Sequence, residues 1–116
     1  MIAELGLPLG QYRILLWLMG AQKDDGMVYA TQQAMSEKLG MDRTTIQKTL
    51  VFLDKIHLVE KVKNGVYRLN AMLRGYESDD DMWAAIDGMP EDERLDTADY
   101  IPWVRRLQRP LKAVAG

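Results

Sequence analysis

The chain of 116 residues contains no cysteine and only one histidine, His57. The lack of cysteine excludes disulfides, thiolate metal sites and cysteine nucleophiles, and a single histidine excludes zinc motifs with two histidine ligands. The longest strictly apolar run, residues 14–19, is far too short to cross a bilayer. The N-terminus lacks the basic start and cleavage site of a signal peptide. These absences favour a cytoplasmic protein with no metal, no cofactor and no membrane partner.

Groups that could perform catalysis are also scarce. Acidic residues are plentiful, but none belongs to a recognisable catalytic pair, and there is no glycine-rich phosphate loop. His57 follows an amphipathic stretch on its apolar side, where a core or boundary histidine is more common than a general base. The consecutive acids at residues 79–81 would not converge on one point of a helix, which makes a metal site there unfavourable. We therefore expect a binding protein and not an enzyme.

Charge is unevenly distributed along the chain. The net charge is −2, but residues 1–76 carry +3, residues 77–99 carry −9 and residues 100–116 carry +4. This shift predicts a boundary near Gly75 between a mildly basic domain, residues 1–76, and an acidic helical extension with a basic tail, residues 77–116. The extension would serve dimerisation or fold back on the domain. Its acids form either a solvated surface or one that competes with DNA or binds a basic partner.

The first seventy residues contain the signals of a helix-turn-helix. A helix is expected over residues 9–21, and it is apolar on so many sides that the C-terminal segment or a second copy should cover it. After a turn and a short extended piece, Thr31 is a good N-cap for a helix over residues 32–39. Gly40 can end that helix, and Asp42 can cap the next one, over residues 43–56. Two helices joined by a short glycine-led turn are typical of this motif.

The second of these helices has two different faces. Its apolar face carries Ile46, Leu50, Leu53 and His57. Its opposite face carries Thr44, Gln47, Lys48, Val51 and Lys55, with Arg43 at the N-terminal entry. Such donors suit phosphates and base edges in the DNA major groove, although a solvated surface helix would carry similar residues.

A β-hairpin is predicted directly after this helix. Residues 58–63 and 66–70 are extended runs joined by Asn64-Gly65, which favours a type I′ turn. The expected pairs are Lys63–Val66, Val62–Tyr67 and Lys61–Arg68. This register places Leu58, Val62, Tyr67 and Leu69 on the core face and Lys61, Lys63 and Arg68 on the other. The predicted fold is therefore mainly α with a small β-hairpin (α+β): a winged helix followed by a helical extension.

The extension should contain short helices. Ser78 followed by Asp81 is a capping box, and Met82, Trp83, Ile86 and Met89 form an apolar stripe. Further short helices are expected over residues 90–97 and from Pro102. Trp17, Trp83, Ile86 and Trp103 are the candidate interface residues, with intrachain packing and dimerisation equally favoured. The basic tail, residues 105–112, either contacts phosphate or is a solvated terminus.

Four short stretches carry a family resemblance: VYATQ at residues 28–32, MSEKLGM at 35–41, TTI at 44–46 and NGVYRLN at 64–70. They resemble the winged helix of RepL-type plasmid replication proteins and, more loosely, MarR-type regulators. The resemblance covers residues 9–76. It implies sequence-specific binding of double-stranded DNA, with residues 43–48 as recognition-helix positions and residues 63–65 as the wing tip. Replication initiator, plasmid-borne repressor and phage regulator all remain open.

The expected function is thus DNA binding by a homodimer that regulates plasmid replication or transcription. The predicted recognition-helix residues are Arg43, Thr44, Thr45, Gln47 and Lys48, and the predicted wing residues are Lys61, Lys63, Asn64 and Arg68. The alternative is a protein-interaction module that uses the tryptophan-containing acidic segment. The small charge of residues 1–76 favours this alternative, because strong DNA binders are generally more basic.

Overall fold

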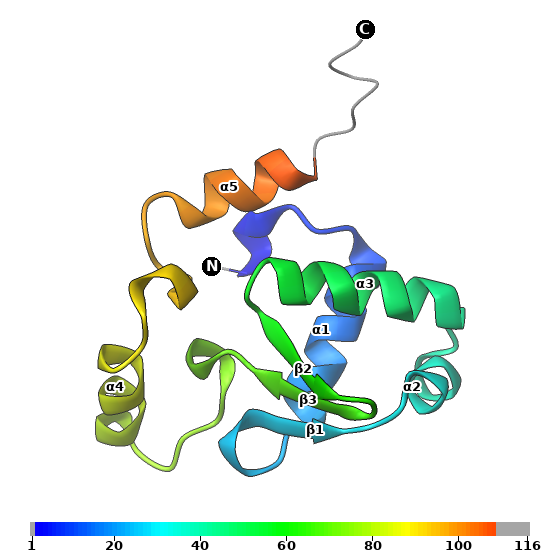
Figure 1. Cartoon of the computed structure of the whole chain (residues 1–116), viewed down its shortest axis with the longest axis horizontal. Coiled ribbons are helices and arrows are strands. Elements are labelled where there is room, and N and C mark those ends of the chain that lie inside the picture. Colours follow the sequence, from blue (N-terminus) through cyan, green and yellow to red (C-terminus); the bar gives the residue numbers. More distant parts are fainter. Residues whose placement is uncertain (1, 109–116) are drawn as a thin grey trace, which may run out of the picture.

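The computed structural model describes residues 2–108. Its helices are α1 (Leu9–Ala21), α2 (Gln32–Leu39), α3 (Arg43–Lys55), α4 (Asp79–Asp87) and α5 (Tyr100–Leu107), and its strands are β1 (Met27–Tyr29), β2 (Val59–Lys63) and β3 (Val66–Leu69). Short 3₁₀ turns are η1 (Ile2–Leu5), η2 (Asp24–Gly26), η3 (Ala71–Leu73) and η4 (Glu91–Glu93). The order α1–β1–α2–α3–β2–β3 gives a winged-helix-like α+β fold, as predicted (Figure 1).

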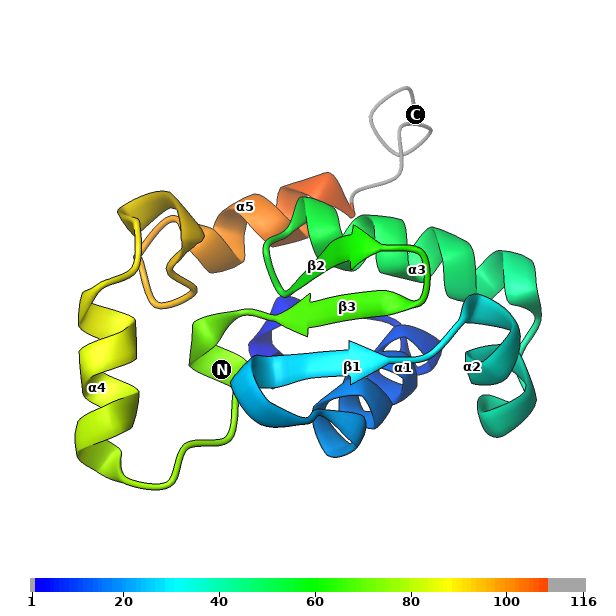
Figure 2. The same cartoon turned by 60° about the horizontal axis from the view of Figure 1, so that its bottom comes forward.

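The sheet has three antiparallel strands in the order β1–β3–β2. The hairpin was expected, and the short extended piece before α2 joins it as β1, with Val28 opposite Tyr67. Figure 2 shows β3 between the other two strands, with α1 behind the sheet. Both side chains of the Val28–Tyr67 pair are buried. This pair therefore anchors the sheet to the helices.

The predicted caps shape the helix-turn-helix. The Thr31 hydroxyl accepts a hydrogen bond from the Ala34 N–H at 3.0 Å, and the Asp42 carboxylate accepts one from the Thr44 N–H at 3.1 Å. Gly40 takes the left-handed conformation with φ 62°, which a glycine adopts at little cost. Because these caps depend on neighbouring residues alone, the sequence predicts them well.

The register of the hairpin differs from the prediction. Lys63 pairs with Val66 as expected, but a bulge between Lys61 and Lys63 shifts the remaining pairs. Lys61 therefore lies opposite Tyr67, not opposite Arg68. A bulge inserts one extra residue into one strand, and a shift of one residue exchanges the two faces of a strand. The predicted pairs Val62–Tyr67 and Lys61–Arg68 are wrong for this reason.

The shift also changes which side chains of β2 reach the core. Val59, opposite Leu69, is 3% exposed, whereas Val62, predicted for the core, is 49% exposed. Lys61 lies on the same face as Tyr67, and Arg68 lies on the other face of the sheet. The three hairpin cations therefore do not share one face.

The extension folds back and completes a single hydrophobic core. This core joins Leu15 of α1 and Leu53 of α3 to Leu95, Tyr100 and Val104 of the extension. In Figure 1, α5 runs alongside η1. Two backbone carbonyls of η1 accept hydrogen bonds from side chains of α5 and its C-cap: Arg105 to Glu4 at 2.8 Å and Gln108 to Leu5 at 2.8 Å. The division at Gly75 stays a prediction, but both predicted units contribute to this core.

Leu9 and Leu16 of α1 are 77% and 59% exposed in the single chain, so cover of this helix by a second copy stays a prediction. The expected helix bounds in the extension require correction. The helix expected over residues 90–97 is only the short turn η4, and α5 begins two residues before Pro102. Proline is tolerated in a first helical turn, since the N–H that it lacks would have no partner in the helix there. The tail residues 109–112 lie outside the described part of the chain.

Candidate nucleic-acid interface

The two faces of α3 differ as the sequence predicts. Ile46, Leu50 and Leu53 are at most 5% exposed and pack into the core. The predicted contact residues Arg43, Thr44, Thr45, Gln47 and Lys48 are all exposed, as are Val51 and Lys55. A helix repeat of 3.6 residues places these two sets on opposite sides. Solvent can therefore reach every predicted recognition-helix residue, while contact with DNA stays a prediction.

A groove of about 290 Å³ lies between α3 and the hairpin. It is lined by Gln32, Gln47, Leu50, Val51, Asp54, Lys55, Lys61 and Tyr67. The shifted register turns Lys61 toward α3, so that it shares this groove with Gln47 and Lys55. Helix and hairpin thus form one surface with amide and ammonium donors.

Gln32 is a groove residue that the sequence prediction missed. It lies at the start of α2, and its amide donates to the Tyr67 hydroxyl of β3 at 3.4 Å. The sequence predicts that Gln32 lies at a helix N-terminus, but its nearness to α3 and β3 depends on the fold. No sequence signal separates it from the neighbouring Gln33, which is exposed on the same helix.

The cations around the groove have no acidic partner. Within residues 2–108, the only ion pair joins Arg94 and Asp96, in the extension. Arg43, Lys48, Lys55, Lys61 and Lys63 therefore carry charge that phosphate could neutralise. Asp54 is the one acid that lines the groove. Its carboxylate accepts a hydrogen bond from the Lys61 N–H at 3.0 Å and so ties β2 to α3.

The tip of the hairpin lies close to the start of α2. The Gly65 carbonyl accepts a hydrogen bond from the Ala30 N–H at 3.0 Å, and a Cβ at Gly65 would lie 3.6 Å from the Thr31 methyl group. Gly65 has φ 76°, which suits the tight turn. Lys63 and Asn64 are exposed beside this contact. The wing is therefore short, and its tip is fixed to the β1–α2 connection.

This surface lies within a recognisable family region. The family model described as Firmicute plasmid replication protein (RepL) matches residues 1–84. The chain belongs to the RepL family. The match spans both helices of the helix-turn-helix and the hairpin, which confirms the resemblance and links the chain to plasmid replication. Searches of curated proteins and of solved structures gave no significant match.

One predicted wing residue of this RepL chain lies away from the groove. Arg68 donates from Nε to the Asp25 carbonyl at 3.4 Å, on the sheet face that does not carry Lys61. It lines a separate polar cleft together with Arg74. Burial, followed by the nearby charge of Arg68, lowers the pKa of Arg74. Arg68 therefore does not share a sheet face with Lys61, contrary to the predicted register, while its contact with DNA stays a prediction.

The candidate interface residues of the RepL chain have different surroundings. Ile86 is buried within its own chain, and Trp17 and Trp103 are partly buried against the core. Trp83 is 55% exposed. His57, expected on the apolar face of α3, is instead exposed after the helix end with φ 68°, and its ring stacks on Trp103 at a centroid distance of 5.5 Å. Helix α3 ends at Lys55, before its repeat would carry His57 inward.

Tyr100, Arg94 and Asp96 are titratable groups of the extension that have structural partners. The Tyr100 hydroxyl donates to the Ile56 carbonyl at 2.6 Å, and burial raises the pKa of Tyr100 well above its usual value. The Arg94 guanidinium donates to Asp96 and lowers the pKa of that carboxyl. Among the described residues, no group of three His, Cys, Asp or Glu side chains is arranged to hold a metal ion. No helix in this part of the chain is long and apolar enough to span a membrane.

Proposed function

We propose that this RepL chain binds double-stranded DNA in a sequence-specific manner and thereby regulates plasmid replication or transcription. It would act in the cytoplasm as a binding protein without a catalytic step. The observation that carries the proposal is the set of unpaired cations and amides on α3 and the adjoining groove. The B-DNA major groove admits an α-helix with such donors. Membership of a plasmid replication family supports the same conclusion.

The surface suggests a division of roles. Gln47 and Thr44 would read base edges, because these side chains offer both donors and acceptors. Arg43 and Lys48 flank them and would contact bases or nearby phosphates. Lys63 at the wing would contact the backbone, which fixes orientation without carrying sequence information.

We also propose that the chain binds DNA as a homodimer. The net charge of residues 1–76 is only +3, and two copies would double the number of phosphate contacts. Leu9 and Leu16 on α1 and Trp83 on α4 are exposed apolar side chains that a second copy could cover. Light scattering of the purified chain, alone and with duplex, measures this directly. A single copy per duplex would contradict the dimer.

The test of DNA binding is fluorescence anisotropy with a random duplex over a salt series. Lys63→Ala should weaken binding to all sequences and lower the salt slope by about one unit, because one phosphate contact is lost. Lys23→Ala removes the same charge from an exposed turn outside the groove and is the matched control. Equal losses in both variants, or no binding by wild type at low salt, would contradict the proposal.

Base reading requires a separate measurement. Selection of preferred sites from a random library should give a different consensus for Gln47→Ala than for wild type, while binding to the random duplex changes little. Equal loss of specific and non-specific binding would show that Gln47 does not read bases.

A further inference from the structure

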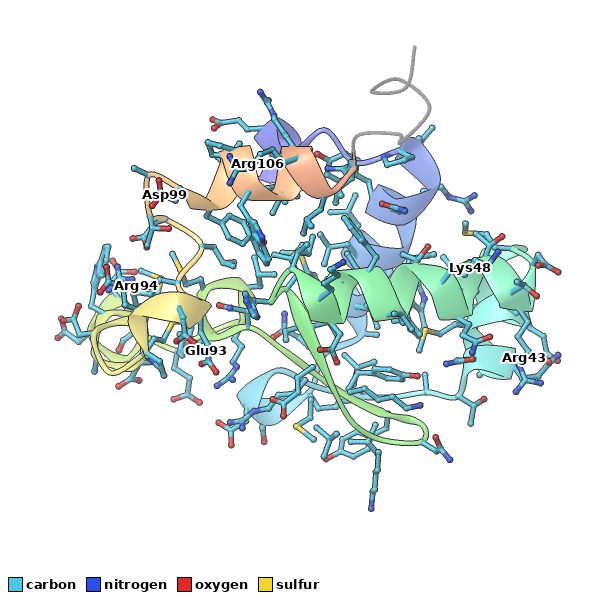
Figure 3. All side chains as sticks on the ribbon, turned by 45° about the horizontal axis from the view of Figure 1, so that its top comes forward. Arg43, Lys48, Glu93, Arg94, Asp99 and Arg106 are labelled. Atoms are coloured by element: carbon cyan, nitrogen blue, oxygen red, sulfur yellow. The ribbon has the colours of Figure 1, made fainter. Side chains whose placement is uncertain are left out.

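A second concave surface lies away from the groove. It is a pocket of about 210 Å³ between the end of α3 and the extension, lined by His57, Glu91, Asp92, Arg94, Thr97, Asp99, Tyr100 and Trp103. All of these except His57 lie beyond residues 1–84, where the family match ends. In Figure 3, Arg94 and Asp99 lie at one end of the molecule, and Arg43 and Lys48 at the other.

Three aromatic rings line this pocket. The rings of His57 and Trp103 stack at 5.5 Å with an interplanar angle of 21°, and Tyr100 lies 6.0 Å from Trp103. The hydrogen bond from Tyr100 to the Ile56 carbonyl fixes the third ring. His57 has φ 68°, a conformation that glycine would adopt with less strain at a helix end. The ring thus occupies its place in the stack despite an unfavourable backbone.

Three carboxylates share the lining with these rings. Glu91, Asp92 and Asp99 are exposed, and none forms an ion pair with another described residue. The one cation in the lining, Arg94, is already paired with Asp96 at 2.7 Å. The lining of the pocket therefore combines aromatic rings with carboxylates that have no cationic partner in the described part of the chain. This arrangement repels DNA and attracts a cation.

We propose that this pocket binds an arginine side chain of a partner protein. A planar guanidinium stacks on aromatic faces, and its N–H groups pair with carboxylates. Cation–π attraction adds to the charge complementarity. The chain would then carry two binding surfaces of opposite charge, one for DNA and one for a basic protein segment. This inference does not depend on DNA binding, and its test uses no DNA.

The test is a titration of the ¹⁵N-labelled full chain with a capped, glycine-flanked arginine peptide, followed by NMR. The matched ligand is the same peptide with citrulline, which keeps the shape and lacks the charge. The Trp103 indole signal, assigned with Trp→Phe variants, should shift and saturate with the arginine peptide only. The indole of Trp83, an exposed ring on the acidic helix α4, should not shift. Equal shifts with citrulline, or equal shifts of Trp83, would overturn the proposal.

Charge-matched variants show whether the pocket itself binds the arginine peptide. Asp92→Asn combined with Asp99→Asn should lower the affinity for the arginine peptide about two- to fivefold, as expected for exposed charge pairs. Asp79→Asn combined with Asp80→Asn removes the same charge from the same acidic segment outside the pocket and should have no effect. Equal weakening by both pairs of substitutions would show that the overall negative charge of the segment attracts the peptide. That result would contradict the proposal.

Two further outcomes would identify a different occupant. Tighter binding of spermidine than of the arginine peptide would point to a small polyamine and contradict a protein partner. Marked tightening in Arg109→Gln combined with Lys112→Gln would show that the basic tail of the chain competes for the pocket. Unchanged affinity in this variant and weak spermidine binding support a partner protein.

Discussion

The α3 face and the C-terminal extension use charge in opposite ways. The α3 face carries cations without acidic partners beside an open groove, on a domain of net charge +3. Residues 77–99 carry −9, yet Leu95 of the same segment is 1% exposed in the common core. A change in charge along a chain therefore need not separate two folded bodies. Here it separates two surfaces that share one core, of which only the first carries the cations that we propose contact DNA.

The largest expected effect tests whether the extension belongs to the core. Leu95→Ala should lower the free energy of unfolding by about 2–5 kcal/mol, because it leaves a cavity among buried side chains. Trp83→Ala, on the exposed side of α4, should change it by less than about 0.5 kcal/mol. Urea unfolding of both variants measures the contrast. Equal stability of wild type and Leu95→Ala would mean that the extension does not stabilise the domain.

The next effect concerns the hydrogen bond between α5 and the end of α3. Tyr100→Phe leaves the Ile56 carbonyl without its donor and should cost about 1 kcal/mol near neutral pH. Above about pH 10, the unfolded wild type releases the Tyr100 proton while the folded state retains it. The stability of wild type should therefore fall as pH rises further, by less than about 1.4 kcal/mol per unit from this group.

Urea unfolding of wild type and Tyr100→Phe at neutral and alkaline pH checks this sign. The stability difference between the two proteins should shrink as the pH rises, because the variant lacks the perturbed phenol. A difference that stays constant with pH would show that Tyr100 is not buried as described.

A smaller effect, on DNA affinity, is expected from removing the acidic charge in the groove between α3 and the hairpin. Asp54→Asn keeps an acceptor for the Lys61 N–H and removes the one acidic charge in the groove, so affinity for a random duplex should rise a few-fold. Asp79→Asn should change it less, because α4 lies at the far end of the molecule from α2 (Figure 1) and salt screens beyond about 10 Å. Anisotropy titrations at matched salt compare the two, and equal gains would mean that net charge alone governs binding.

The smallest effect is expected at the exposed ion pair of the extension. Arg94→Gln should leave stability unchanged at neutral pH, since exposed pairs contribute little. The lowered pKa of Asp96 means that any contribution of the pair is present above about pH 4 and is lost below it. Acid titrations of wild type and Arg94→Gln should therefore converge below this pH, and a stability difference that appears only in acid would contradict the pair.

The parts of the site that were predictable depend on local chemistry. Thr31, Gly40, Asp42 and Ser78 act where the sequence places them, because a cap needs only its own turn of helix. The exposed face of α3 follows from helical periodicity for the same reason.

The parts that were missed depend on contacts distant in sequence. The bulge beside Lys61 changes which cation shares the groove with Gln47, and nothing in the Asn64-Gly65 turn signals it. The predicted register of Arg68 is wrong for the same reason. Gln32 lines the groove because the fold brings the start of α2 within hydrogen-bond distance of Tyr67 on β3, which no local pattern indicates.

Short-range patterns thus account for helices α1 to α4, the caps, the turn and the charge of each segment, since these depend on residues a few positions apart. Long-range packing decided the register of the wing and how far each tryptophan is buried. It also brought His57 from the end of α3 onto Trp103 of α5. Burial of Leu95, Tyr100 and Val104 against core residues distant in sequence has no local signature, because any apolar surface of suitable shape could have received them.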